Sequence, residues 1–379
     1  MKVGILGAGQ LGRMLAQAGS PLGHQFRFLD PATEISAAGF GEHHCAAFED
    51  VDALAQFADG LDVVTYEFEN VPVESARWLA ERLPVHPNPE ALRIAQDRLF
   101  EKTAFNDHQI PTAEFAAVYY RDEFDAAVAR MGLPVVIKTR RFGYDGKGQR
   151  VARTPAEKDA AWKDLRGVPL FVEKFVPFQR ELSIIAARGT DGAFVAWPLV
   201  ENHHRTGILR LSLAPAEAVA PELQAAAESC ARRWMEAVGY VGVLAIEFFE
   251  VGGKLVANEM APRVHNSGHW TMDSHGASQF ANHIRAITGA KLESTRGPGA
   301  TAMINLIGEL PSANGIAAVE AVGGRVHLYG KSPRAGRKIG HINVGAEDAA
   351  GLLAKLEALA PKLAIAELTE VLATRAGLY

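Results

Sequence analysis

Short apolar strands alternate with helical segments over residues 1–89, and no other feature constrains the fold of this chain as strongly. The predicted strands are Lys2–Leu6, Gln25–Leu29, Val63–Tyr66 and Pro84–His86. The predicted helices that separate them are Gly9–Leu22, Val51–Phe57 and Val73–Leu83. Alternation of this kind is typical of a parallel sheet with helices on its faces. We therefore predict an α/β domain that ends at Pro89, where two prolines oppose helical geometry in the residues before them.

Three glycines directly after the first strand open the first helix. Gly7, Gly9 and Gly12 fit the pattern GxGxxG, and Asp30 ends the next strand. The pattern is typical of dinucleotide binding, with the acidic residue on a ribose hydroxyl. The same glycines suit any close strand-to-helix crossing, and a helix N-terminus binds many phosphates and carboxylates. A nicotinamide cofactor, a different anion and a turn without a ligand all remain open at this point.

Beyond residue 89 the pattern changes from alternation to a series of strands. One helix is predicted at Glu90–Asp107. It precedes strands with period-two character at Val135–Thr139, Leu170–Lys174, Glu181–Ala187, Leu244–Phe249 and Leu255–Asn258. After about Pro298, short strands at Ala300–Leu306 and Arg325–Tyr329 precede a helix at Ala346–Leu359. We therefore predict three domains, at residues 1–89, 90–297 and 298–379.

Composition narrows the classes of function. The chain of 379 residues has 48% hydrophobic and 22% charged residues, which is ordinary usage for packed domains. Its 39 basic and 44 acidic side chains give a net charge of −5, so we expect no nucleic-acid partner. Cys45 and Cys230 lie far apart without metal-ligand spacing, which fits a reducing cytoplasm. No signal peptide or membrane-spanning segment is predicted, so we expect no membrane partner.

A lysine and a glycine-rich loop form the first constellation with a clear chemistry. Lys138 ends an apolar strand, and the loop Gly143-Tyr144-Asp145-Gly146-Lys147-Gly148-Gln149 follows it closely. A cation held by a strand can meet phosphate oxygens, while backbone N–H groups and Lys147 close over a polyphosphate. The alternative is a solvated basic hairpin. Three glycines, with a tyrosine and an aspartate among them, favour the phosphate loop.

Carboxylates mark two further segments. Glu173-Lys174-Phe175-Val176 is followed by Glu181, and such an extended segment can present its backbone to adenine and a carboxylate to ribose. Glu247 and Glu259 lie on the two strands of a predicted hairpin, where carboxylate and amide oxygens suit Mg²⁺. A two-residue turn at Gly252-Gly253 would put Glu259 on the opposite face from Glu247, so the site requires an odd-numbered loop. A surface pair of glutamates is the alternative.

These pieces, in this order, resemble the ATP-grasp superfamily. Over nearly its whole length the chain is similar to the N5-carboxyaminoimidazole ribonucleotide synthase family. The similarity rests on the stretches Gly7–Met14, Tyr66–Pro72, Gly143–Gln149, His204–Leu209, Asn258–Thr271 and Tyr329–His341. It implies a fold of mixed α/β and α+β class: an ATP-grasp fold with a Rossmann-like first domain, a two-lobed ATP clamp and a small β-rich C-terminal domain. Thr206 departs from the family pattern, in which we expect an aspartate.

The activity that the resemblance implies is that of an ATP-dependent carbon–nitrogen ligase. Bicarbonate would attack the γ-phosphate of ATP to give carboxyphosphate and ADP. The carboxyl group would then pass to the amine of 5-aminoimidazole ribonucleotide, in purine biosynthesis. The resemblance further implies Mg²⁺, with Mn²⁺ as a substitute, small-molecule substrates, and a homodimer in the cytoplasm.

The resemblance also gives each candidate residue a role. ATP would be held by Arg98, Lys138, Gly143, Tyr144, Asp145, Gly146, Lys147, Gly148, Gln149, Glu173, Lys174, Phe175, Val176, Glu181, His204, Asn258 and Glu259. The metal ligands would be Glu247 and Glu259. The ribonucleotide would contact Gln10, Leu11, Glu67, Asn266, Lys331, Arg337 and Lys338. The groups nearest the chemistry would be Tyr144, Asp145, Lys147, Arg263 and His265.

Three alternatives compete with this assignment. An oxidoreductase built on the glycine pattern at Gly7 would bind a nicotinamide cofactor. A nucleotide sensor would bind ATP without turnover, although the glutamate pair and Lys147 argue against it. A formate-dependent glycinamide ribonucleotide transformylase would share the ATP clamp, but it lacks the stretch His265–Thr271.

Overall fold

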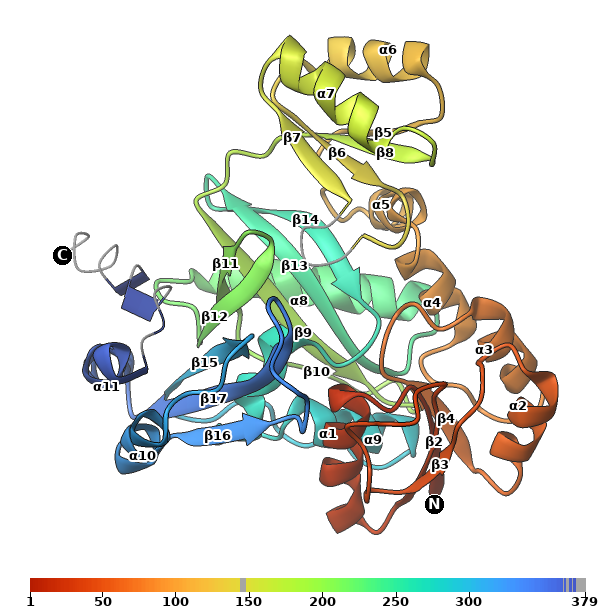
Figure 1. The fold of residues 1–379 in the computed structure, drawn as a ribbon, viewed down its shortest axis with the longest axis vertical. Coiled ribbons are helices and arrows are strands. Elements are labelled where there is room, and N and C mark those ends of the chain that lie inside the picture. Colours follow the sequence, from red (N-terminus) through yellow and green to blue (C-terminus); the bar gives the residue numbers. More distant parts are fainter. Residues whose placement is uncertain (144–147, 364, 366–367, 370, 373–379) are drawn as a thin grey trace.

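The described part of the chain forms three sheets around which its helices pack, and Figure 1 shows a small lobe standing away from a broader base. The structure, a computed structural model, describes residues 1–143, 148–363, 365, 368–369 and 371–372. No helix in these residues is both long and apolar enough to cross a bilayer.

The N-terminal sheet is parallel, with strand order β3-β2-β1-β4. Its strands are β1 (Lys2–Leu6), β2 (Gln25–Leu29), β3 (Glu42–His44) and β4 (Val63–Tyr66), and its helices are α1 (Gln10–Gly19), η1 (Ser20–Leu22), α2 (Val51–Ala58) and α3 (Val73–Ala80). The strand predicted at Pro84–His86 is reduced to a single parallel bridge between Val64 and Val85. β3 was not predicted, because Glu42-His43-His44 carries no apolar alternation.

The link to the rest of the chain corrects one prediction. Glu90–Asp107 was expected to be one helix, but it forms α4 (Pro89–Ala95) and α5 (Arg98–Asp107). Asp97 separates them: its carboxylate caps α5 by accepting from Leu99 N at 3.0 Å. The same carboxylate binds Arg140 at 2.7 Å, so the start of α5 is tied to the small lobe.

The small lobe is an antiparallel sheet with two helices. Its strand order is β5-β8-β6-β7, with β5 (Phe115–Val118), β6 (Val135–Thr139), β7 (Gln149–Ala152) and β8 (Leu170–Lys174), covered by α6 (Arg121–Met131) and α7 (Pro155–Leu165). Phe124, Ile137 and Leu170 belong to a hydrophobic core that is separate from the others. Because it has its own core, this lobe, at the top of Figure 1, can move as a unit.

The large sheet runs from the central domain into the C-terminal domain. Its order is β14-β13-β9-β11-β12-β15-β17-β16, and β10 pairs with β9. The strands are β9 (Arg180–Arg188), β10 (Phe194–Ala196), β11 (Val200–Arg205), β12 (Ile208–Ala214), β13 (Gly242–Val251), β14 (Lys254–Ala261), β15 (Ala300–Ile307), β16 (Arg325–Leu328) and β17 (Lys338–Ala346). Because β12 pairs with β15, the sheet continues across residue 297, and a domain boundary there remains a prediction.

The helices that pack on the large sheet are α8 (Pro221–Ala237), η2 (Asn266–Met272), α9 (Gln279–Ile287), α10 (Ala313–Ala321) and α11 (Ala349–Leu363). One core joins this sheet to the N-terminal domain, with Met14 of α1 and Phe280 and Ile284 of α9 among its members. This packing brings the start of α1 close to η2.

Candidate functional site

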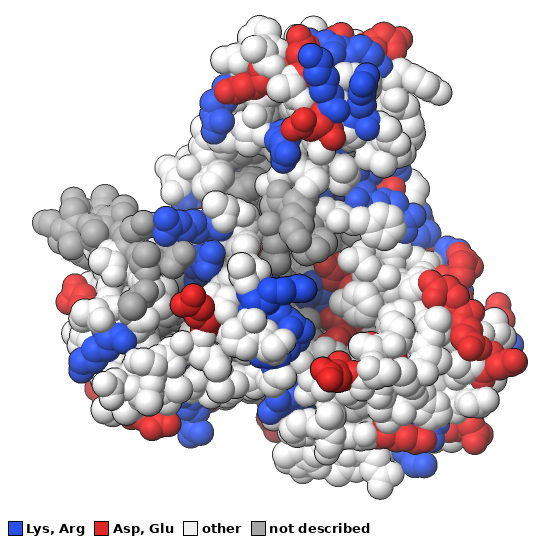
Figure 2. Space-filling view, viewed as in Figure 1, with Lys and Arg blue, Asp and Glu red and all other residues white. Residues whose placement is uncertain are grey.

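Two cavities meet in the middle of the molecule. The outer cavity, of about 340 Å³, lies between the small lobe and the large sheet. The inner cavity, of about 460 Å³, lies between the N-terminal domain and the large sheet. Both are lined by Arg98, Glu247 and Glu259, which therefore form their junction. Figure 2 shows basic and acidic side chains side by side where this face is hollowed.

Glu247 and Glu259 lie opposite each other on one face of the hairpin. The cause is not the odd-numbered loop that was predicted. The turn is the two-residue Gly252-Gly253, with positive φ at both glycines, and not an odd-numbered loop. Phe248 pairs with Ala257 and Glu247 with Glu259, so Asn258 is one extra residue in β14. This β-bulge shifts the register by one residue and returns Glu259 to the face of Glu247.

Two residues of α5 hold the bulge on both sides, and neither was predicted. The Lys102 ammonium donates to the carbonyl of Ala257 at 2.9 Å, and Met260 N donates to Glu101 Oε1 at 2.6 Å. Arg98, one turn earlier on the same helix, binds the Glu259 carboxylate at 3.1 Å. The spacing i, i+3 and i+4 from Arg98 is the signal that could have identified both residues.

The charged side chains at the junction shift one another's pKa values. Burial and the charge of Glu259 raise the pKa of Glu247. Burial also favours the neutral form of Glu259, but Arg98 and Lys138 outweigh it and lower the pKa of Glu259. Burial and the same Glu259 charge raise the pKa of Glu101 to about 8. Two carboxylates that face each other across a cavity repel each other, and a cation between them would remove that cost.

The outer cavity has a floor of paired charges. Lys138 and Glu173 form an ion pair, and Lys102 lies 3.4 Å from the same carboxylate. Burial disfavours the ionised carboxylate, but these two lysines outweigh it and hold the pKa of Glu173 at about 2. Burial lowers the pKa of Lys138, against the opposing effect of Glu173. The predicted phosphate-binding lysine is thus fixed in position by a buried glutamate.

The far wall of the outer cavity carries a second pair. Glu181 Oε2 lies 3.0 Å from His204 Nδ1. Burial alone would lower the pKa of His204, but the bond to Glu181 and the charges of Glu247 and Glu259 raise it to about 9. Thr206, where an aspartate was expected, adopts a φ of 52° in the β11–β12 turn, and its hydroxyl donates to Arg205 O at 2.7 Å.

The end of β8 and the two residues after it line the outer cavity, from Glu173 to Val176, but the side chain of Lys174 points elsewhere. The Lys174 ammonium donates to the carbonyls of Met131 and Gly132 at the end of α6. Only the backbone of Lys174 is therefore available to a ligand. Gln149 lines the outer cavity and Gly143 the inner one, and Gly148 bonds to Thr139 across the base of the loop. Tyr144, Asp145, Gly146 and Lys147 lie outside the described residues.

The glycine pattern at the start of α1 is occupied by a side chain of the protein itself. Both oxygens of Glu67 accept from the helix N-terminus, from Gly9 N and, at 2.6 Å, from Gly12 N. A Cβ added to Gly7 or Gly9 would lie 2.5 Å from the Glu67 side chain. Asp30 accepts from Ala8 N and Ala32 N, each at 2.8 Å.

The glycines thus make room for a carboxylate that takes the position of a pyrophosphate, and both oxygens of Asp30 already accept from backbone N–H groups. This arrangement argues against a nicotinamide cofactor. Within the described residues the N–H groups of Gln10 and Leu11 have no partner, so they remain available to an anion.

Most of the predicted ribonucleotide residues gather around the inner cavity. Gln10, Leu11, Glu67, Asn266 and Lys338 line it, and Lys331 donates to the Gln10 side chain. Within the part of the chain that the structure describes, neither amide atom of Asn266 has a hydrogen-bond partner, although both are buried. Arg337 instead donates to Ser332 of its own loop, at 3.0 Å to Oγ, and does not line the cavity.

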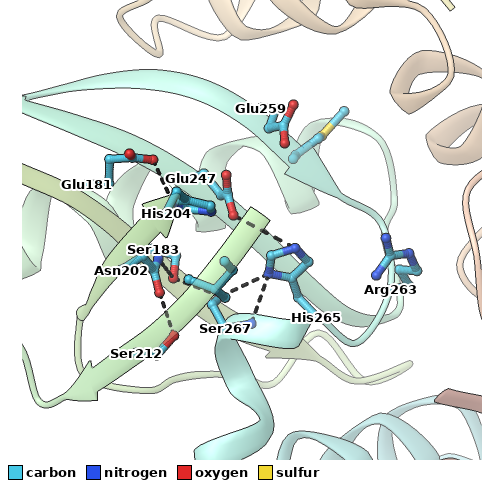
Figure 3. A network of polar contacts seen from close by, with 12 residues as sticks. Glu181, Ser183, Asn202, His204, Ser212, Glu247, Glu259, Arg263, His265 and Ser267 are labelled. Carbon is cyan, nitrogen blue, oxygen red and sulfur yellow. Dashed lines mark hydrogen bonds and ion pairs between the residues drawn. The ribbon is translucent and has the colours of Figure 1, made fainter. Parts of the chain in front are cut away.

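Arg263 and His265 lie on the wall between the inner cavity and the junction (Figure 3). Arg263 forms an ion pair with Glu69, a residue that the sequence did not single out. His265 Nε2 lies 3.8 Å from Glu247 Oε1. Burial, with Arg263 and Lys338 nearby, lowers the pKa of His265 to about 3, so its imidazole is neutral near pH 7.

The donor set at the junction fits a hard divalent cation. Glu247 and Glu259 supply carboxylates. Asn258, the residue before Glu259, adds an amide oxygen that is buried and has no hydrogen-bond partner in the described residues. Oxygen ligands of this kind are those that Mg²⁺ takes, together with water and phosphate oxygens. The described residues include no group of three or more His, Cys, Asp or Glu side chains arranged for a metal, which leaves most of the coordination shell to other ligands.

Comparison with known proteins decides the family. Three family models match: the ribonucleotide synthetase preATP-grasp domain over residues 1–96, the ATP-grasp domain over 103–280, and the phosphoribosylaminoimidazole carboxylase C-terminal domain over 301–355. The N5-carboxyaminoimidazole ribonucleotide synthase of Pseudomonas aeruginosa is 51% identical over 356 residues, which cover 94% of this chain and 98% of that one. The chain belongs to the N5-carboxyaminoimidazole ribonucleotide synthase family.

Solved structures of the same family agree with this assignment. The N5-carboxyaminoimidazole ribonucleotide synthetase of Thermus thermophilus superposes with a TM-score of 0.91 at 52% identity, covering 95% of this chain and 98% of that chain. The synthase of Aspergillus clavatus in complex with ADP and 5-aminoimidazole ribonucleotide gives 0.85 at 30% identity, covering 96% and 98%. The predicted family and ATP-grasp fold are therefore confirmed, and the enzyme class of the family is that of an ATP-dependent ligase.

Proposed function

We propose that this chain uses ATP and bicarbonate to carboxylate the amine of 5-aminoimidazole ribonucleotide through carboxyphosphate. The observation that carries the proposal is the shared junction. The outer cavity and the inner cavity meet at Arg98, Glu247 and Glu259, so an acyl phosphate made from a nucleotide in one cavity can meet an amine held in the other. A short path of this kind protects a short-lived anion from water.

ATP is assigned to the outer cavity. Lys138 and His204 are the cations that face polyphosphate there, and Glu181 and the backbone of Val176 serve the ribose and the adenine. The Val176 N–H has no partner within the described residues, so it is available to a base edge. Within the loop, Tyr144, Asp145 and Lys147 remain candidates on the resemblance alone.

Mg²⁺, or Mn²⁺ in its place, is assigned to Glu247 and Glu259, with Asn258 beside them. When bound, the cation would neutralise charge on the phosphates. Arg98 stays on Glu259 and orients that carboxylate. In the first step a bicarbonate oxygen bonds to the γ-phosphorus, and the bond to the β–γ bridging oxygen breaks to release ADP.

The second step takes place in the inner cavity. The amine nitrogen bonds to the carbon of carboxyphosphate as the bond from that carbon to the phosphate oxygen breaks, and the departing inorganic phosphate takes the proton that the nitrogen loses. Arg263, held by Glu69, and Lys338 face the anion, while Asn266 and the free N–H groups of Gln10 and Leu11 face the ribonucleotide. His265 is neutral near pH 7, so it acts there as a hydrogen-bond donor.

The test is ADP release from MgATP and bicarbonate, measured with and without 5-aminoimidazole ribonucleotide. We expect release to depend on that nucleotide. Glycinamide ribonucleotide with formate is the control for a relative that shares the ATP clamp. Turnover only with glycinamide ribonucleotide and formate would assign the chain a different substrate. Absence of turnover in both assays would overturn the proposed function. We also propose a cytoplasmic homodimer, which sedimentation of the pure protein would test.

A further inference from the structure

A row of buried polar side chains runs from the interior of the large sheet to His265 (Figure 3). Ser212 of β12, Asn202 of β11, Ser183 of β9 and Ser267 of η2 follow one another, and each is at most 4% exposed. The successive contacts are 2.7 Å, 2.9 Å and 2.9 Å, and a last one of 2.9 Å joins Ser267 Oγ to His265 Nδ1. Four polar groups at such depth cost stability unless each is satisfied.

The row has a direction, because Asn202 has different atoms at its two ends. Ser212 donates to Asn202 Oδ1, and Asn202 Nδ2 donates to Ser183 Oγ. Ser183 therefore uses its own proton toward Ser267, and Ser267 uses its proton toward His265 Nδ1. The backbone N–H of Ser267 points at the same nitrogen at 3.3 Å. Nδ1 must accept, so the ring proton is on Nε2.

The backbone of His265 is held separately. Gln279 accepts from His265 N at 2.9 Å and donates to His265 O at 2.7 Å, in the manner of a neighbouring strand. A Cβ on Gly268 would lie 2.5 Å from the Gln279 side chain, so the turn is shaped around this contact. The imidazole plane is thus fixed from two sides. Its Nε2–H faces the inner cavity beside Glu247, and the 3.8 Å gap to that carboxylate is too long for a hydrogen bond.

We propose that Ser183, Asn202, Ser212 and Ser267 are positioning residues that hold His265 in the Nε2–H tautomer, as a donor to an oxygen of the carboxyl group being transferred. The inference rests on the proposed function for the identity of that group. The tautomer itself follows from the row together with the backbone N–H of Ser267. The donor needs no proton transfer, since a hydrogen bond aimed at developing charge is sufficient.

Asn202→Asp is the sharpest test, because it reverses the row without changing its shape. A carboxylate accepts from both serines, so Ser183 would donate toward residue 202 and lose its proton toward Ser267. Ser183→Ala interrupts the row without adding a buried charge. Ser75→Ala, which removes a hydroxyl buried in α3, is the matched control. The nitrogens of His265 are observed in protein labelled with 15N-histidine, and their signals are assigned by their loss in His265→Gln.

In the unmodified protein we expect an unprotonated Nδ1 and a protonated Nε2. In both row variants the Nδ1–H form should become populated, because Ser267 Oγ is then free to accept from His265 and the 3.3 Å contact from Ser267 N is the remaining bond that opposes it. We expect kcat to fall roughly 10-fold while KM for ATP changes less than two-fold. Ser75→Ala should match the unmodified protein. An unchanged nitrogen pattern in Ser183→Ala and Asn202→Asp would overturn the proposal, as would a loss of kcat with that pattern intact. If the unmodified protein lacks turnover with 5-aminoimidazole ribonucleotide, the proposed function fails, and the nitrogen pattern still decides the row.

Discussion

The outer and inner cavities differ in how their polar groups are satisfied. In the outer cavity Lys138 and Lys102 are paired with Glu173, and His204 is paired with Glu181. Among the described residues, the inner cavity keeps both amide atoms of Asn266 buried without a partner. In the outer cavity an unpartnered buried oxygen, Asn258 Oδ1, lies beside the proposed metal ligands. Groups that are paired in the folded chain contribute to its stability, whereas unpartnered buried groups cost stability and are explained by a ligand. Stability and affinity should therefore separate between the two cavities.

The largest effect is expected at the junction, which belongs to both cavities. Glu259→Gln or Glu247→Gln should lower turnover with 5-aminoimidazole ribonucleotide at least about 1000-fold, because a cation site worth several kcal/mol loses one of two carboxylates. ADP release at saturating substrates measures it. Stability without ligands should not fall in Glu247→Gln, because that substitution relieves repulsion between the two carboxylates. Glu259→Gln should lose some stability, because it removes the charge that pairs with Arg98.

Glu250→Gln is the control, since Glu250 lies on the same strand but pairs with Arg180, outside both cavities. Turnover of Glu259→Gln within ten-fold of the unmodified protein would show that the junction does not hold the metal.

Lys102→Met should separate stability from chemistry in the outer cavity. It removes one of two lysines from the buried Glu173 and leaves the Ala257 carbonyl without its donor. We expect the free energy of unfolding in urea to fall by about 3 kcal/mol. KM for ATP should rise as well, because Glu173, which positions Lys138, is held by one lysine fewer.

Lys158→Met, which breaks the more exposed pair with Asp125, should change the unfolding free energy by less than about 1 kcal/mol. Equal losses in the two lysine variants would contradict a framework role for the Glu173 pair.

The pairing of His204 should be visible as a pH dependence of stability. Although burial opposes it, Glu181 raises the pKa of His204 from 6.5 to about 9 on folding. The stabilisation is thus complete below pH 6.5 and is lost as the pH rises through about 9. It amounts to up to about 3 kcal/mol. His204→Gln should flatten the curve of unfolding free energy between these pH values, and His203→Gln is the control. A curve as steep in His204→Gln as in the unmodified protein would refute the pairing.

The sequence predicted the components of both cavities better than the contacts between them. Lys138, Glu173 and Glu181 were placed because each ends or begins a strand with a clear apolar pattern. Glu247 and Glu259 were correctly predicted to lie on one face of the hairpin, but the predicted cause, an odd-numbered loop, was wrong. Two-residue periodicity contains no signal for a bulge, since Asn258 becomes the extra residue only when α5 holds Ala257 and Met260.

Other contacts depend on residues that are far apart in the chain. Glu67 lies 55 positions after Gly12, so the helix N-terminus looked open to an external anion although a carboxylate occupies most of it. Asn202 and Ser183 were missed because single polar residues in buried strands have no periodicity of their own. Asp97, in contrast, was a helix-cap residue whose local signal could have divided the predicted helix at Glu90–Asp107.

The smallest effect is expected for Asn266 in the inner cavity, where a substitution should change substrate affinity without lowering stability. Asn266→Ala removes an amide that is unsatisfied in the ligand-free protein, so the unfolding free energy should stay unchanged or rise. KM for 5-aminoimidazole ribonucleotide should rise about five-fold, since one lost hydrogen bond costs about 1 kcal/mol. Asn282→Ala is the opposite case, because both ends of that amide bond to the backbone of Glu293. It should lose about 1–2 kcal/mol of stability and leave KM unchanged. If Asn266→Ala were the destabilised variant, Asn266 would be a structural residue, and the contrast between the cavities would fail at its main example.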